Sequence, residues 1–116
     1  MDLVIDDINF AKGDGLVPII VQDSASSQVL MLGYANHDAV AKTLETGKLH
    51  LWSRSRQSLW LKGERSGNFL LVRELAIDCD GDSLLAVVTP ATGETPVCHT
   101  GQETCFFRPL PLPSAG

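Results

Sequence analysis

Short apolar segments separated by turn-forming residues recur along this chain, and they limit the possible folds more than any other feature. Residues 16–21 and 28–34 are rich in Val, Ile and Leu, and the polar stretch 22–27 between them predicts a β-hairpin. Similar segments recur at four further places, residues 49–52, 58–62, 69–79 and 84–89. We therefore expect about six strands, with Pro18 either at the start of its strand or near a sheet edge.

One segment instead has the spacing of an α-helix. Asn36 is a suitable N-cap, Asp38 lies where the helix dipole favours an acid, and Gly47 suits the position after the last turn. Apolar side chains recur between them at helical intervals, at Ala39, Val40, Thr43 and Leu44. The sequence thus predicts one main helix of about three turns.

Length and composition indicate one small, β-rich α+β domain. The chain has 116 residues, of which 44% are hydrophobic, enough for a single core. We expect the domain at residues 1–108 and an extended Pro-rich tail at residues 109–116. The acidic first residues do not resemble a secretory leader, and no apolar run approaches the ~20 residues of a membrane span. We therefore expect a cytoplasmic protein that does not associate with membranes.

The charge is distributed unevenly. The net charge is −5, but residues 48–73 hold six basic residues and one acidic residue, so that segment carries +5 and the remainder −10. This pattern argues against binding of nucleic acid and favours a small phosphate-bearing ligand, although a solvated basic face has the same composition. Hydroxyls and cations in this segment are the candidate substrate-binding groups, at Ser53, Arg54, Ser55, Arg56 and Lys62. Ser-Arg repeats also occur as plain solvent-facing loops.

Three aspartates alternate with other residues at positions 78, 80 and 82. In an extended chain, Asp78, Asp80 and Asp82 would share one face, with Cys79 on the other. Carboxylates so close repel one another unless a cation lies between them, and Mg2+ prefers oxygen ligands. The alternative is a polar turn after a strand, in which Gly81 makes the bend and the acids are solvated.

The chain has three cysteines, an odd number that is a poor basis for a disulfide framework. We therefore expect reduced thiols. The spacing of Cys98 and Cys105 is not that of a zinc finger. Together with Cys79, however, they offer three thiolates, which would leave one position of a tetrahedral Zn2+ open for water. Nucleobase deaminases use such sites. The alternative is buried cysteines that serve as small apolar residues. His99 could be a fourth ligand, a general acid or base, or a histidine bonded to backbone; we favour the acid/base role.

Taken in order, the motifs of this chain resemble one known family. The motifs that carry the resemblance are Val29-Leu30-Met31-Leu32-Gly33-Tyr34-Ala35-Asn36, Trp52-Ser53-Arg54-Ser55-Arg56, Leu59-Trp60, Asp78-Cys79-Asp80-Gly81-Asp82, Cys98-His99-Thr100-Gly101 and Cys105-Phe106. They resemble phosphoribosyl-AMP cyclohydrolases over residues 15–108. Leu51, where an aromatic residue is common, and Arg65, where a smaller polar residue is usual, depart from the family pattern.

The resemblance implies an enzyme, a fold and a set of site residues. The family hydrolyses the N1–C6 bond of the adenine ring in N1-(5-phosphoribosyl)-AMP, the third step of histidine biosynthesis. Its members are intertwined homodimers that require zinc and magnesium. The resemblance assigns zinc to Cys79 of one subunit and to Cys98 and Cys105 of the other. It assigns magnesium to the three aspartates at positions 78, 80 and 82.

Two other functions are compatible with parts of the sequence. One is a different zinc-dependent nucleobase hydrolase such as a deaminase, although the His/Cys-x-Glu and Pro-Cys-x-x-Cys signature of deaminases is missing. The other is a non-catalytic dimer stabilised by zinc that binds a partner protein. The three aspartates argue against it, because a purely structural zinc has no need of them.

Overall fold

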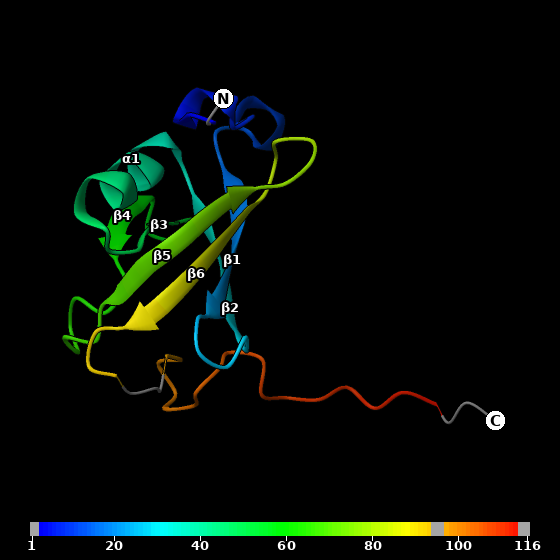
Figure 1. The fold of residues 1–116 in the computed structure, drawn as a ribbon. Helices are drawn as coiled ribbons and strands as arrows, with labels where there is room; N and C mark the ends of the chain where they lie inside the picture. Colours follow the sequence, from blue (N-terminus) through cyan, green and yellow to red (C-terminus); the bar gives the residue numbers. More distant parts are fainter. Residues whose placement is uncertain (1–2, 94–96, 114–116) are drawn as a thin grey trace.

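The computed structural model describes residues 3–93 and 97–113, and this part forms a β-rich α+β domain (Figure 1). The elements in chain order are η1 (Ile5–Asp7), η2 (Ala11–Gly13), β1 (Val17–Asp23), β2 (Val29–Ala35), α1 (His37–Thr46), β3 (His50–Ser53), β4 (Ser58–Leu61), β5 (Leu70–Ile77) and β6 (Leu84–Pro90). The expected six strands and main helix are confirmed. The two short 3-10 turns before β1 were not expected from the sequence.

Four strands form the main sheet, in the order β2-β1-β6-β5. The β1–β2 hairpin is confirmed as antiparallel, β5 pairs antiparallel with β6, and β1 pairs parallel with β6. Strand β1 is therefore interior, so the edge position considered for Pro18 is wrong. Pro18 is the second residue of β1, and the ladder to β6 begins only at Ile19. Its missing N–H consequently interrupts no bond to β6.

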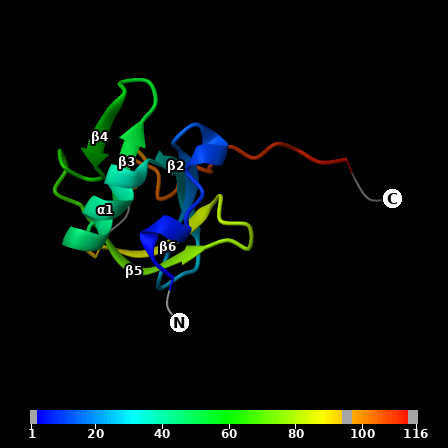
Figure 2. The same ribbon diagram turned by 90° about the horizontal axis from the view of Figure 1, so that it is seen from above.

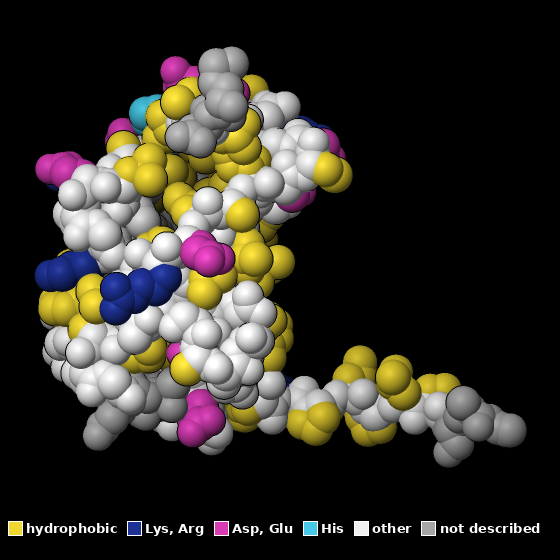
Figure 3. All heavy atoms as spheres, in the orientation of Figure 1, with side chains coloured by type: hydrophobic (Ala, Val, Ile, Leu, Met, Phe, Trp, Pro, Cys, Tyr) yellow, Lys and Arg dark blue, Asp and Glu magenta, His cyan; other side chains and the backbone are white. Residues whose placement is uncertain are grey.

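One face of the sheet packs against α1 and the two-stranded β3–β4 hairpin (Figure 2). The buried side chains alternate along β1 and β6, as expected for strands with one covered face: Val17, Ile19, Val21, Leu84, Ala86 and Val88. The opposite face has no layer over it in the described part of the chain. There Ile20 is 38% exposed and Leu32 is 44% exposed. Figure 3 shows hydrophobic side chains along the side of the body from which the tail projects.

The helix begins and ends where the sequence predicts. Asn36 Oδ1 accepts a hydrogen bond from the Ala39 N–H at 2.9 Å, and Gly47 ends the helix with a φ of 75°. Thr43 is buried, and its hydroxyl accepts a bond from the His50 N–H at 2.9 Å, which ties α1 to β3. Leu44 lies at the exposed margin of the apolar stripe.

Residues 109–113 have no regular secondary structure and extend away from the body (Figure 1). Leu110 and Leu112 are both almost fully exposed. The last three residues of the expected tail, 114–116, lie outside the described part. None of the described helices is long and apolar enough to span a bilayer.

Candidate active site

The three aspartates lie in the turn that joins β5 to β6. Ligand atoms of Asp78, Asp80 and Asp82 all lie within 4.8 Å of one another. Among the described residues they form the one group of three potential metal ligands. The expected strand to residue 79 was two residues too long, because β5 ends at Ile77. The expectation of one face of an extended chain is therefore wrong: a turn bent at Gly81, whose φ is 80°, gathers the carboxylates.

Hydrogen bonds within this acidic turn fix the carboxylate of Asp78. It accepts bonds from the Ser83 hydroxyl at 2.7 Å and from the Asp82 N–H at 2.9 Å. The Ser83 hydroxyl is the largest cause that lowers the pKa of Asp78 to about 2. A hydrogen bond shared with Asp82 raises the pKa of Asp80. The turn therefore concentrates negative charge that a hard cation would relieve, and its oxygen ligands fit Mg2+.

Lys12 supplies a positive charge to the acidic turn. Its Nζ lies 2.6 Å from an Asp82 carboxylate oxygen and 3.5 Å from one of Asp80. The hydrogen bond to Asp82 raises the pKa of Lys12. Sequence reasoning missed this residue, because Lys12 and Asp80 are 68 positions apart and no pattern links them.

Cys98 and Cys105 come together at the opposite end of the sheet. Cys98 is buried, and the Thr100 hydroxyl lies 3.1 Å from its sulfur, which lowers the pKa of the thiol. The Cys105 N–H donates to the Leu30 carbonyl of β2 at 2.7 Å. Cys105 is an exposed residue, but partial burial of its sulfur, and then the Cys98 thiol beside it, raise its pKa. Two adjacent sulfur donors suit Zn2+ better than Mg2+.

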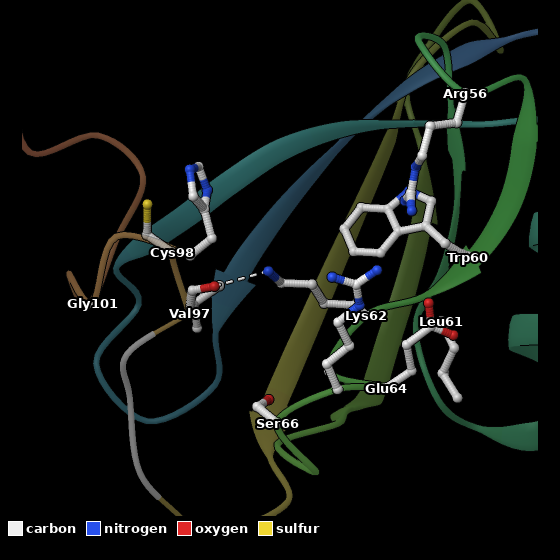
Figure 4. A pocket seen from close by; sticks show the side chains of 12 residues that line it. Arg56, Trp60, Leu61, Lys62, Glu64, Ser66, Val97, Cys98 and Gly101 are labelled. Carbon is white, nitrogen blue, oxygen red and sulfur yellow. Dashed lines mark hydrogen bonds between the residues drawn. The ribbon is translucent and has the colours of Figure 1, made fainter.

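An open cavity of about 510 Å³ lies beside Cys98 (Figure 4). Four predicted site residues line it: Arg56, Lys62, Cys98 and His99. Lys62 is half-buried, and its Nζ donates to the Val97 carbonyl at 2.8 Å. Burial lowers the pKa of Lys62, whereas the charges of Cys105 and Cys98 raise it. The cavity therefore combines the Cys98 thiol with several cations, and the cations suit an anionic ligand.

Three predicted substrate-binding residues do not line this cavity. The Ser53 hydroxyl accepts bonds from the N–H and Nε of Arg56 and so shapes the loop. Ser55 is exposed in the same loop. The guanidinium of Arg54 instead stacks on the Tyr34 ring, 3.8 Å from its centroid. Sequence reasoning did not assign Trp60, Arg65 and Val97 to the site, although all three line the cavity.

The β5–β6 turn, which contains Cys79, lies at the opposite end of the sheet from the segment after residue 96, which contains the other two cysteines (Figure 1). It precedes β6 in the acidic turn, whereas Cys98 follows the far end of β6. Seven residues of strand span roughly 20 Å. Zinc–sulfur bonds are about 2.3 Å long, so these three thiols of one chain cannot share one zinc ion.

The described features together suit a metal-dependent enzyme: they are a thiol pair, a basic cavity and a carboxylate cluster on one β-rich domain. The sequence profile of phosphoribosyl-AMP cyclohydrolases matches residues 31–107. The chain belongs to the phosphoribosyl-AMP cyclohydrolase family.

Individual relatives agree with this assignment. The chain is 55% identical over 103 residues to the phosphoribosyl-AMP cyclohydrolase of Solibacter usitatus, covering 89% of this chain and 80% of that protein. It is 47% identical over 104 residues to the enzyme of the same name from Lacticaseibacillus paracasei, covering 90% and 92%. It is also 56% identical over 99 residues to the histidine biosynthesis bifunctional protein HisIE of Vibrio vulnificus, covering 85% of this chain and 46% of that protein.

Proposed function

We propose that this chain hydrolyses the N1–C6 bond of the adenine ring in N1-(5-phosphoribosyl)-AMP. Membership of the family makes it a cyclohydrolase of histidine biosynthesis. The observation that most supports this reaction is the adjacent pair of thiols, Cys98 and Cys105, beside a cavity that Cys98 lines together with Arg56 and Lys62. The thiols would hold a metal, and the cations would hold phosphate. Such an enzyme would work in the cytoplasm.

The proposed zinc site is shared between two subunits. Cys98 and Cys105 would bind zinc together with Cys79 of the partner subunit. The separation of Cys79 from the other thiols within one chain supports this arrangement. The uncovered apolar face of the sheet supports a homodimer, because side chains such as Ile20 and Leu32 gain from burial. When bound, zinc lowers the pKa of a coordinated water and so supplies a nucleophile near neutral pH.

We assign the proton transfer to His99, which lines the cavity next to Cys98. C6 of the substrate is electrophilic because N1 is alkylated and the ring is cationic. The imidazole of His99 would take a proton from the attacking water and return it to N1 as the C6–N1 bond breaks. The product of this hydrolysis carries a carboxamide at the former C6, and no ammonia is released.

Magnesium and the basic residues would hold the phosphates. The carboxylates of Asp78, Asp80 and Asp82 would bind magnesium, since they offer three oxygen donors within 4.8 Å of one another. The substrate-binding cations would be Arg54, Arg56 and Lys62, helped by the hydroxyls of Ser53 and Ser55. The acidic turn and the cavity lie at opposite ends of the sheet within one chain. A second subunit would therefore be needed to bring them to one substrate.

An absorbance assay with N1-(5-phosphoribosyl)-AMP tests the reaction, because ring opening changes the near-ultraviolet spectrum. We expect turnover with zinc and magnesium, its loss after chelation of zinc, and its return when zinc is restored. Release of ammonia would identify a deaminase instead. Folded, zinc-loaded protein without turnover would favour the non-catalytic, partner-binding dimer.

Co-expression of two inactive variants tests the shared zinc site. Heterodimers of Cys79→Ser and Cys98→Ser subunits would contain one intact site and one doubly altered site. Random pairing should then restore about one quarter of the wild-type activity. Co-expression of Cys98→Ser with Cys105→Ser is the matched control, since neither subunit has a complete thiol pair and no activity should return. The same lack of recovery with the first pair would rule out sharing.

A further inference from the structure

Arg54 and Tyr34 form an aromatic–cation pair outside the cavity. Tyr34 lies near the end of edge strand β2, opposite Pro18 in the β1–β2 ladder. This register puts it on the same face as Leu32, the face that is uncovered in the described part of the single chain and that the proposed homodimer would use. The Arg54 guanidinium carbon lies 3.8 Å from the centroid of the Tyr34 ring. Arg54 thus points around the sheet edge, whereas Arg56 of the same loop lines the cavity.

The local backbone brings this loop to the sheet edge. At Gly33, a Cβ atom would lie 3.2 Å from Leu51 Cδ2, so the absence of a side chain allows β3 to approach β2 closely. Leu51 is fully buried at this contact. The Gln57 side chain also donates to the Arg54 carbonyl at 2.7 Å, which fixes the loop backbone. The meeting of Arg54 and Tyr34 is therefore built into the packing of the hairpin on β2.

Stacking leaves the hydrogen-bonding edge of the guanidinium available. A cation over a ring uses its planar face, and its N–H donors point outward in the same plane. No hydrogen bond or ion pair joins the Arg54 guanidinium to any other side chain in the described part of the chain. A guanidinium held in one place with free donors is preorganised for bidentate binding of a phosphate.

We propose that Tyr34 is a positioning residue that holds Arg54 to bind one phosphate of the substrate, apart from the cations of the cavity. This inference rests on the proposed function, whose substrate carries two phosphate groups. Arg56 and Lys62 in the cavity would hold one of them, and Arg54 at the sheet edge would hold the other. Selectivity for a substrate with two phosphates follows, because a ligand with a single phosphate engages only one of these positions.

Steady-state kinetics of Tyr34 and Arg54 variants test the proposal. Tyr34→Leu should raise KM about three- to fivefold, with kcat changed less than twofold, because an exposed cation–π contact has about that strength. Tyr34→Phe keeps the ring and should raise KM less than Tyr34→Leu does. Arg54→Lys keeps the charge but loses the planar stack and the bidentate donors, so it should also raise KM.

A double-mutant cycle separates positioning from a structural role. If Tyr34 acts through Arg54, Tyr34→Leu should have no further effect on KM in the Arg54→Ala background. An equal increase of KM in both backgrounds, or a loss in kcat, would overturn the positioning role. If Arg54→Ala leaves KM unchanged, the substrate contact assigned to Arg54 fails, and the positioning role fails with it. An effect of Arg54→Ala without one of Tyr34→Leu sinks the positioning role alone. Thermal unfolding of each variant verifies that it is folded.

Discussion

The acidic turn and the cavity beside Cys98 lie at the two ends of β6, and they are built in different ways. The turn consists of consecutive residues, and the bonds that shape it lie almost entirely within residues 78–83. The cavity combines the β3–β4 hairpin with residues 97–101, joined by the contact of Lys62 with the Val97 carbonyl. One site is thus local in sequence, whereas the other exists only when distant segments pack.

The two sites also differ in charge. The acidic turn offers three carboxylates, and the one described cation that pairs with them is Lys12. The cavity offers cations beside thiols. One end of the sheet therefore supplies carboxylates, and the other end supplies cations and thiols. Two chains in antiparallel contact would bring these groups together. This complementarity is the physical reason why the proposed homodimer would complete two sites at once.

The largest predicted effect concerns the cavity. Cys98→Ser should abolish zinc binding at the site and reduce activity on the order of 1,000-fold, because Lewis-acid chemistry supplies several kcal/mol to such reactions. Zinc content of purified protein, measured beside turnover, checks this. Cys79→Ser, in the acidic turn, should likewise abolish both zinc binding and activity. Activity retained by zinc-free Cys98→Ser would contradict the proposed mechanism.

A smaller effect is expected at the acidic turn. Asp80→Asn should weaken magnesium binding roughly tenfold, because removal of one carboxylate lowers the negative charge offered to the cation. Calorimetric titration with magnesium measures this directly, and zinc content should remain unchanged. Lys12→Met, which keeps all three carboxylates, is the matched control and should not weaken binding. Unchanged magnesium binding in Asp80→Asn would argue that the carboxylates are not the ligands.

The contact that joins the cavity segments should contribute modestly to stability. Lys62→Met leaves the carbonyl of the buried residue Val97 without its donor, at a cost of about 1–2 kcal/mol in the free energy of unfolding. Lys62→Arg keeps a donor and should lose less. Urea unfolding of the two variants checks this prediction. Equal stability of wild type and Lys62→Met would show that the segments hold together without the contact.

The smallest effect is expected at Asp23, which accepts hydrogen bonds from a serine hydroxyl as Asp78 does in the acidic turn. In the β1–β2 turn, the Ser26 N–H and hydroxyl each donate to Asp23 at 2.8 Å and lower the pKa of Asp23. Since the folded-state pKa is depressed, this stabilisation is present above the unfolded pKa of 3.8 and is lost as pH falls through the folded value. Ser26→Ala should raise the pKa of Asp23 towards 3.8, as NMR titration of the carboxyl carbon would show. No change would mean that the hydroxyl is not a donor in solution.

Local features were the ones that could be predicted from the sequence. The residue types within each short segment predict the cap at Asn36, the end of the helix at Gly47 and the six strands, and the structure confirms them. The closeness of the three aspartates was also predicted, although for the wrong reason. Alternation in a strand and a tight turn both bring together carboxylates two residues apart, and the sequence does not distinguish them.

Non-local contacts could not be predicted in the same way. Lys12 reaches the aspartates across 68 positions, and Lys62 reaches Val97 across 35. The alternation of Arg54 and Arg56 gave no sign that one would stack on Tyr34 and the other line the cavity. Those outcomes depend on how the β3–β4 hairpin sits against β2, which in turn depends on a glycine at position 33.

The parallel pairing of β1 with β6 has a consequence for synthesis of the protein. Ile19 pairs with Leu84, about 65 residues later in the chain. At a translation rate of ~5–20 residues per second, the β1–β2 hairpin waits several seconds for its central neighbour. During that interval the unpaired backbone N–H and C=O groups along one edge of β1 are open to pairing with other nascent chains. Chaperone binding at this stage of translation would protect the exposed strand until β6 is available to pair with it.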